Sequence, residues 1–143
     1  MLVQSFVEPV QPGDLGAVVF TRDPDRGTLK MRGEYEPGLG AQHVVGGKRR
    51  PHPLGQGEQS LAVRDPAAFA ELERLARALD ESFDEPLELE LVRSQGVVWL
   101  LQVRPLVLSA RALVRVTLDA IDADSPRFRA YAERLLDAGL HGF

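Results

Sequence analysis

The sequence of 143 residues contains no cysteine and no long apolar run. The absence of cysteine excludes disulfide bonds, thiolate zinc sites and thiol nucleophiles, and it favours a reducing compartment. No apolar segment approaches the roughly 20 residues that span a bilayer, and the first residues lack the basic and apolar regions of a signal peptide. From these absences we expect a cytoplasmic protein that does not enter membranes.

Concentrated positive charge is also missing. Charged residues make up 27% of the chain, the formal net charge is -4, and Lys48-Arg49-Arg50 is the longest run of one sign. Such a triplet in a loop is more often solvated than bound to phosphate, and nucleic-acid-binding domains normally carry an extended basic surface. We therefore expect no nucleic-acid partner.

The first part of the chain is typical of short strands joined by turns. Residues 2–10 and 15–21 are apolar and rich in β-branched side chains, and the turn residues 11–14 separate them. Apolar and polar residues alternate over 28–35, which predicts half of a partly buried hairpin. Residues 37–57 are rich in glycine and proline, which predicts a loop with at most one strand.

Three segments have the spacing and start signals of helices. Asp65 followed by Pro66 predicts an N-cap and a first helical residue, and apolar residues then recur at helical spacing to residue 83. Ser109 and Ser125-Pro126 begin two further helices, the second of which ends at Gly139. The sequence thus predicts an α+β fold with a mostly antiparallel sheet and one packed amphipathic helix over residues 1–108, followed by a helical hairpin or connector over 109–143.

Residues 86–105 form the segment with the most chemical information. If Ser94-Gln95-Gly96 is a three-residue loop with glycine in the left-handed conformation, the even-numbered residues of both strands share one face. Glu88 then lies opposite Gln102, with Glu90 and Arg104 as diagonal neighbours. The other face is expected to point into the core. It carries Leu87, Leu89, Leu91, Val97, Trp99, Leu101 and Val103.

Two interpretations of the even-numbered face are open. Two carboxylates and an amide oxygen suit Mg²⁺, which is usually held by one or two carboxylates together with substrate phosphates. Alternatively, these residues are the solvated side of a half-buried hairpin. A two-residue loop would shift the register and disperse the cluster.

This hairpin resembles the ATP-grasp nucleotide-binding domain of the pyruvate phosphate dikinase and phosphoenolpyruvate synthase family. In that family a strand with two acidic residues is followed by a Leu-Gln-x-Arg signature at the same spacing. Residues 16–24 (GAVVFTRDP) resemble the family's Gly-Val-x-Phe-Thr-Arg-Asn/Asp-Pro segment, Gly33-Glu34-Tyr35 follows at the expected distance, and residues 40–53 resemble a glycine-rich loop. The matches keep their order over about residues 1–120, the C-terminal half of that domain.

The resemblance implies a role for each polar residue of the hairpin. Glu90 and Gln102 would hold Mg²⁺ against the phosphates of ATP, Glu88 would contact the nucleotide at its ribose, and Arg104 would act in catalysis by neutralising the transferred phosphoryl group. The implied partners are ATP, an N-terminal ATP-grasp lobe and a phosphohistidine domain, in the same parent chain or in a separate subunit. In the family, ATP and orthophosphate phosphorylate a histidine, which later passes the phosphoryl group to pyruvate.

The sequence also departs from the family pattern. The loop acid is replaced near Ala41-Gln42, and Glu88 stands where the family usually has aspartate. None of the histidines has the setting of a phosphoacceptor. We therefore expect a partial nucleotide-binding domain that is inactive alone and self-associates through the surface that the other lobe would cover. The alternative is a non-catalytic nucleotide-binding or regulatory module derived from that fold.

Overall fold

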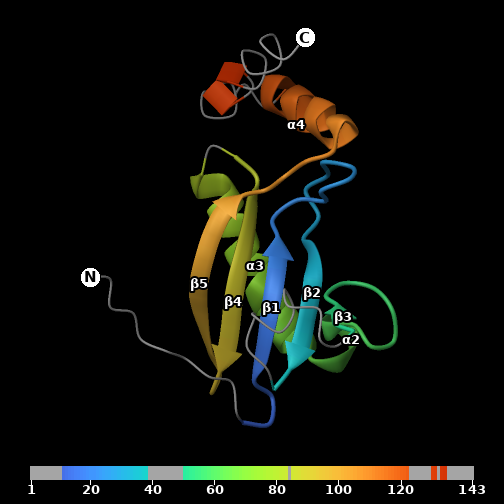
Figure 1. The fold of residues 1–143 in the computed structure, drawn as a ribbon, viewed down its shortest axis with the longest axis vertical. Helices are drawn as coiled ribbons and strands as arrows, with labels where there is room; N and C mark the ends of the chain where they lie inside the picture. The colour runs from blue at the N-terminus through green and yellow to red at the C-terminus, as the bar shows by residue number, and fades with distance from the viewer. Residues whose placement is uncertain (1–10, 39–49, 84, 123–129, 132, 135–143) are drawn as a thin grey trace, which may run out of the picture.

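The computed structural model describes residues 11–38, 50–83, 85–122, 130, 131, 133 and 134. Within these ranges, antiparallel strands form a single sheet in the order β3-β2-β1-β4-β5 (Figure 1). The strands are β1 Leu15–Phe20, β2 Arg32–Pro37, β3 His52–Pro53, β4 Leu87–Ser94 and β5 Val97–Pro105. The helices are α2 Leu61–Arg64, α3 Pro66–Ser82 and α4 Ala110–Asp122. The predicted α+β class is confirmed.

Helix α3 lies across one face of the sheet (Figure 1). Its start follows the sequence signals, because the Asp65 carboxylate accepts the N–H of Ala68 at 3.0 Å and Pro66 occupies the first turn. The helix ends at Ser82, one residue before the predicted end. Leu72 and Ala76 are buried on its inner side. The prediction of an amphipathic helix packed on the sheet is therefore confirmed.

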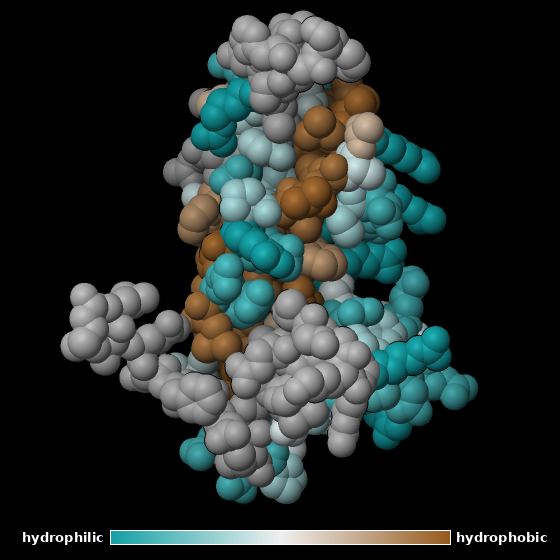
Figure 2. Space-filling view, in the orientation of Figure 1, coloured by the Kyte–Doolittle hydropathy of each residue, from teal (hydrophilic) through white to brown (hydrophobic). Residues whose placement is uncertain are grey.

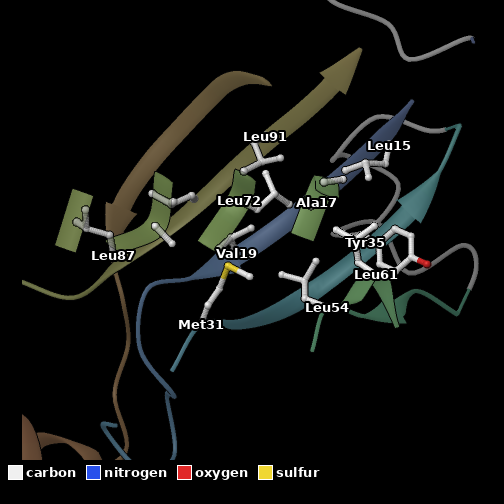
Figure 3. Close-up of a cluster of buried hydrophobic side chains, with 13 residues drawn as sticks. Leu15, Ala17, Val19, Met31, Tyr35, Leu54, Leu61, Leu72, Leu87 and Leu91 are labelled. Carbon is white, nitrogen blue, oxygen red and sulfur yellow. The ribbon is translucent and has the colours of Figure 1, made fainter. Parts of the chain in front are cut away.

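The hydrophobic core lies between α3 and the sheet (Figure 3). Strand residues at every second position point toward α3, as the period of a β-strand requires. The core residues from the strands are Leu15, Ala17, Val19, Tyr35, Leu87, Leu89 and Leu91. Each fully buried leucine stabilises the fold by about 1.5–3 kcal/mol relative to an exposed one. The opposite face of the sheet, which we call the second face, carries the remaining positions of these strands.

Helix α4 lies at the end of the sheet where β1 ends and β2 begins (Figure 1). The predicted cap is confirmed, because Ser109 Oγ accepts the N–H of Ala112 at 3.1 Å. Ser109 also donates its own N–H to the carbonyl of Pro24, at 3.0 Å. No helix in the described part of the chain is both long enough and apolar enough to cross a membrane.

Several sequence predictions fall on segments outside the described residues. These are the strand over 2–10, the loop region around Ala41-Gln42 and Lys48-Arg49-Arg50, and most of the helix over 125–139. Residues 130, 131, 133 and 134 of that last segment are helical. The division of the chain at residue 108 stays a prediction.

Candidate site on the second face of the sheet

The turn between β4 and β5 differs from the predicted loop. Ser94 pairs with Val97, so the turn contains two residues, Gln95 and Gly96, with φ of 53° and 76°. Two successive positive φ values are typical of the type I′ turn, whose twist matches a hairpin. Gly96 is left-handed as predicted, but the three-residue loop is wrong. Asp14 stabilises the turn by accepting the N–H of Gln95 at 2.8 Å.

A β-bulge at Leu101 returns Gln102 and Arg104 to the face that carries Glu88 and Glu90. A regular hairpin with a two-residue turn would place them on the other face. Leu91 pairs with Leu100, whereas Glu90 pairs with Gln102, so Leu101 is the additional residue. Beyond the bulge, Glu88 lies opposite Arg104. The predicted partners are therefore wrong, since Glu88 was expected opposite Gln102. The prediction that Glu88, Glu90, Gln102 and Arg104 share one face is correct.

The two-residue turn changes which residues in the first half of β5 face the core. Before the bulge, Trp99 pairs with Val92 and so lies on the second face, where its exposed fraction is 45%. Val97 lies on that face as well. Their predicted core positions are wrong, because the two-residue turn reverses the faces of this half of β5. Val98 takes the place expected for Val97 and packs against the core.

The strand register arranges the polar residues of the second face in rows. One row contains Arg32, Phe20, Glu88 and Arg104, from β2, β1, β4 and β5 in turn. The next contains Glu34, Val18, Glu90 and Gln102. Figure 2 shows an apolar stripe along this face with hydrophilic residues beside it. In the register, Phe20 and Val18 of β1 separate the charged residues of β2 from the polar residues of β4 and β5.

Glu88 and Arg104 form an ion pair at one end of this group. Arg104 Nη2 donates to Glu88 Oε1 at 2.5 Å, and the Glu88 side chain is largely buried while that of Arg104 is half exposed. The hydrogen bond to Glu88 raises the pKa of Arg104, and the charges of Glu88 and Glu90 raise it further. The guanidinium is thus held in place and fully charged.

Glu90 and Gln102 provide the oxygen atoms best suited to a hard cation. Their facing positions place a carboxylate next to an amide oxygen. Among the described residues, no group of three or more acidic or histidine side chains is placed to hold a metal ion. The donor set fits Mg²⁺ only when phosphate oxygens complete the coordination, which is the usual arrangement for this ion with nucleotides.

Comparison with known proteins agrees with the resemblance found in the sequence. No protein-family profile matches the chain. It is 29% identical over 120 residues to a pyruvate, phosphate dikinase of Rhizobium meliloti, which covers 75% of this chain and 13% of the relative. It is also 29% identical over 105 residues to the chloroplastic enzyme of Flaveria trinervia, and 28% identical over 124 residues to pyruvate, phosphate dikinase 2 of Zea mays. These two matches cover 73% and 85% of this chain and 11% and 13% of the relatives.

The chain is related to the pyruvate, phosphate dikinases. It spans only about an eighth of the length of these relatives.

The sequence analysis missed a buried polar network at the end of β1. The segment Thr21-Arg22-Asp23 lies in the stretch 16–24 that resembles a family motif in the sequence. Its partners are distant in the chain. Arg22 Nη2 lies 3.2 Å from Asp80 Oδ2 on α3, and Arg22 Nη1 lies 3.4 Å from Asp119 Oδ2 on α4. The available signal was Asp80 itself, a charged residue four positions after Ala76 on the buried side of a helix.

Asp23 organises the turn that follows β1 in this dikinase-related chain. Its Oδ1 accepts the backbone N–H groups of Asp25 and Arg26 at 3.0 Å, and its Oδ2 accepts from Arg32 Nε at 3.0 Å. Burial alone would raise the pKa of Asp23, but these hydrogen bonds and the charge of Arg32 outweigh burial and lower the pKa below 3.8. Asp23 is thus a structural acid, because its acceptor oxygens are already engaged within the turn.

Proposed function

We propose that the second face of the sheet is part of a Mg-ATP site in a pyruvate, phosphate dikinase-type phosphotransferase that phosphorylates a histidine on another domain. The observation that supports this most strongly is the register beyond the bulge, with Glu90 opposite Gln102 and Glu88 opposite Arg104. The relationship to proteins named pyruvate, phosphate dikinase supports the same reaction class. The domains that would supply the rest of the site and the phosphohistidine are part of the proposal.

In this proposal each residue has a defined task. Glu90 and Gln102 present two oxygen ligands, and bound magnesium would screen charge on the phosphates. Arg104 presents donors that stabilise negative charge on the transferred group. Glu88 Oε1 already accepts from Arg104, so the proposed contact with the nucleotide uses Oε2. Catalysis of this kind depends on positioning and electrostatics. In this proposal the pair with Glu88 holds the Arg104 guanidinium in position, and the guanidinium supplies the positive charge.

A second candidate function is nucleotide binding without turnover. The departure from the family at Ala41-Gln42 favours it, because a loop acid of the family is absent there. Both candidates predict Mg-ATP binding at the same residues. They differ in turnover when the remaining domains are supplied, since the non-catalytic module binds ATP without forming a phosphohistidine.

Titration of the chain with Mg-ATP, followed by proton–nitrogen NMR, tests the shared part of the proposal. We expect a Kd in the millimolar range or weaker, about -4 kcal/mol, because the chain provides only part of a nucleotide clamp. Glu90→Gln removes a charged ligand and is expected to weaken binding at least tenfold. The control Glu58→Gln changes an exposed glutamate away from the sheet face and is expected to bind like the native chain. Equal binding by both variants would contradict the site.

A further inference from the structure

A side chain holds the first residue of β4, in addition to a backbone hydrogen bond. Thr21 follows the last residue of β1, and its N–H donates to the carbonyl of Leu87 at 3.0 Å. The N–H of Leu87 donates to Thr21 Oγ at 2.9 Å. The hydroxyl therefore acts as the acceptor at the point where β1 leaves the sheet. Leu87 directly precedes Glu88, so this bond fixes the backbone that carries the site.

Asp80 fixes the orientation of that hydroxyl. Thr21 Oγ donates to Asp80 Oδ1 at 3.0 Å, which leaves its lone pairs for Leu87. Asp80 is 4% exposed, and Arg22 balances its charge through Nε at 3.3 Å and Nη2 at 3.2 Å. A buried ionised carboxylate is stable only with such partners. The network thus has a defined direction, from Arg22 through Asp80 and Thr21 to the start of β4.

We propose that Thr21 is a positioning residue for the nucleotide site. Its hydroxyl, oriented by Asp80, sets the backbone at Leu87 so that Glu88 faces Arg104. This inference rests on the proposed function for its biological meaning, but the geometric claim concerns only Thr21, Glu88 and Arg104. Neither Thr21 nor Asp80 contacts the ligand in this proposal. Both act through the first residues of β4.

The carbon-13 NMR signal of the Arg104 guanidinium reports directly on its pair with Glu88. Glu88→Gln removes the charge from the pair and defines the signal of an Arg104 without its anionic partner. Thr21→Val keeps the shape of the side chain but loses the hydroxyl. It is expected to move the Arg104 signal from its native position by more than half of the shift that Glu88→Gln causes. Thr21→Ser restores the hydroxyl and is expected to leave the signal near its native position. An unmoved signal in folded Thr21→Val overturns the proposal.

Two further variants separate positioning from general loss of stability. Leu75→Ala weakens the packing of α3 without touching the network, and the Arg104 signal is expected to stay unchanged. If Thr21→Val does not fold, Thr21→Cys serves in its place, because a thiol is a weak donor and acceptor of similar size. Its signal is expected between those of the serine variant and Glu88→Gln. A native signal in Thr21→Cys would overturn the proposal equally.

The same variants distinguish failure of this inference from failure of the proposed function. If both are right, Thr21→Val weakens Mg-ATP binding by a factor similar to that of Glu88→Gln, and Thr21→Ser does not. In one outcome Thr21→Val moves the Arg104 signal, but Glu88→Gln, Glu90→Gln and Thr21→Val all bind Mg-ATP as the native chain does. The proposed nucleotide site is then wrong, and the positioning role of Thr21 stands. If Glu88→Gln and Glu90→Gln weaken binding while Thr21→Val leaves the signal unmoved, the positioning is wrong.

Discussion

Glu90 lies directly opposite Gln102, although the turn that joins their strands contains only two residues. A regular hairpin with such a turn would place Leu101 opposite Glu90 and turn Gln102 toward α3. The bulge at Leu101 absorbs the additional residue and returns Gln102 and Arg104 to the acidic face. The candidate site therefore depends on an irregularity in the strand.

Cysteine pairs test this register without interference, since the native chain has no cysteine. The double variant Glu90→Cys/Gln102→Cys is expected to form a disulfide readily under mild oxidation, because facing residues have Cβ atoms about 4.5–5.5 Å apart. The matched pair Glu88→Cys/Gln102→Cys is diagonal and is expected to react at least tenfold more slowly. Faster reaction of the second pair, measured by mass spectrometry, would restore the register of a three-residue loop.

Gly27, in the turn that follows β1, lies against the backbone of Ala112 in α4. Its φ is +72°, and a Cβ atom there would lie 2.4 Å from the carbonyl oxygen of Ala112. Gly27→Ala is therefore expected to displace α4 and to lower stability by about 2 kcal/mol or more, since both backbone strain and a clash contribute. Urea unfolding gives the loss of stability, and hydrogen exchange of α4 shows the displacement.

Gly57→Ala is the matched control for this change. Its φ is +99°, but no atom lies within 4 Å of the added Cβ. We expect a loss near 1 kcal/mol from the backbone conformation alone, with α4 unaffected. Equal losses in the two variants would show that the contact with Ala112 has no energetic role.

Asp23 gives a pH dependence whose sign follows from its lowered pKa. Its contribution to stability is present above the unfolded value near 3.8 and is lost as the pH falls through the lower value of the folded state. Asp23→Asn is expected to cost about 1–3 kcal/mol at pH 7, because a charged acceptor of several hydrogen bonds is removed. The difference from the native chain, measured by urea unfolding, should shrink as the pH is lowered below 3.8. A difference that stays constant to pH 2 would contradict this.

Local signals in the sequence were sufficient for α3, α4 and most strands, whereas the short helix α2 was not predicted. Asp65-Pro66 and Ser109 begin α3 and α4 as predicted, because a cap and the first turn depend on neighbouring residues. The period of a strand places Glu88 with Glu90 on one face of β4, and Gln102 with Arg104 on one face of β5. That the two pairs share a face was predicted from a three-residue loop, but in the structure it depends on the bulge.

The turn between β4 and β5 depends on a contact that is distant in sequence. Gln95 adopts a left-handed conformation that is unfavourable for a non-glycine residue, and Asp14, 81 residues away, accepts its N–H. Arg22 likewise finds Asp80 across 58 residues and Asp119 across 97. Spacing within one segment does not specify such partners, so the pairs within the hairpin and the buried network required the folded structure.

The most direct test of the nucleotide site replaces Mg²⁺ with paramagnetic Mn²⁺. In an NMR titration of the native chain with Mn-ATP, we expect broadening of the side-chain amide of Gln102 and of the backbone signals of Glu90, while signals of α3 on the opposite face keep their widths. Mn²⁺ without ATP is expected to broaden them far less, because the described residues provide no complete set of metal ligands. Broadening centred on α3, or equal broadening with and without ATP, would contradict a Mg-ATP site on the second face.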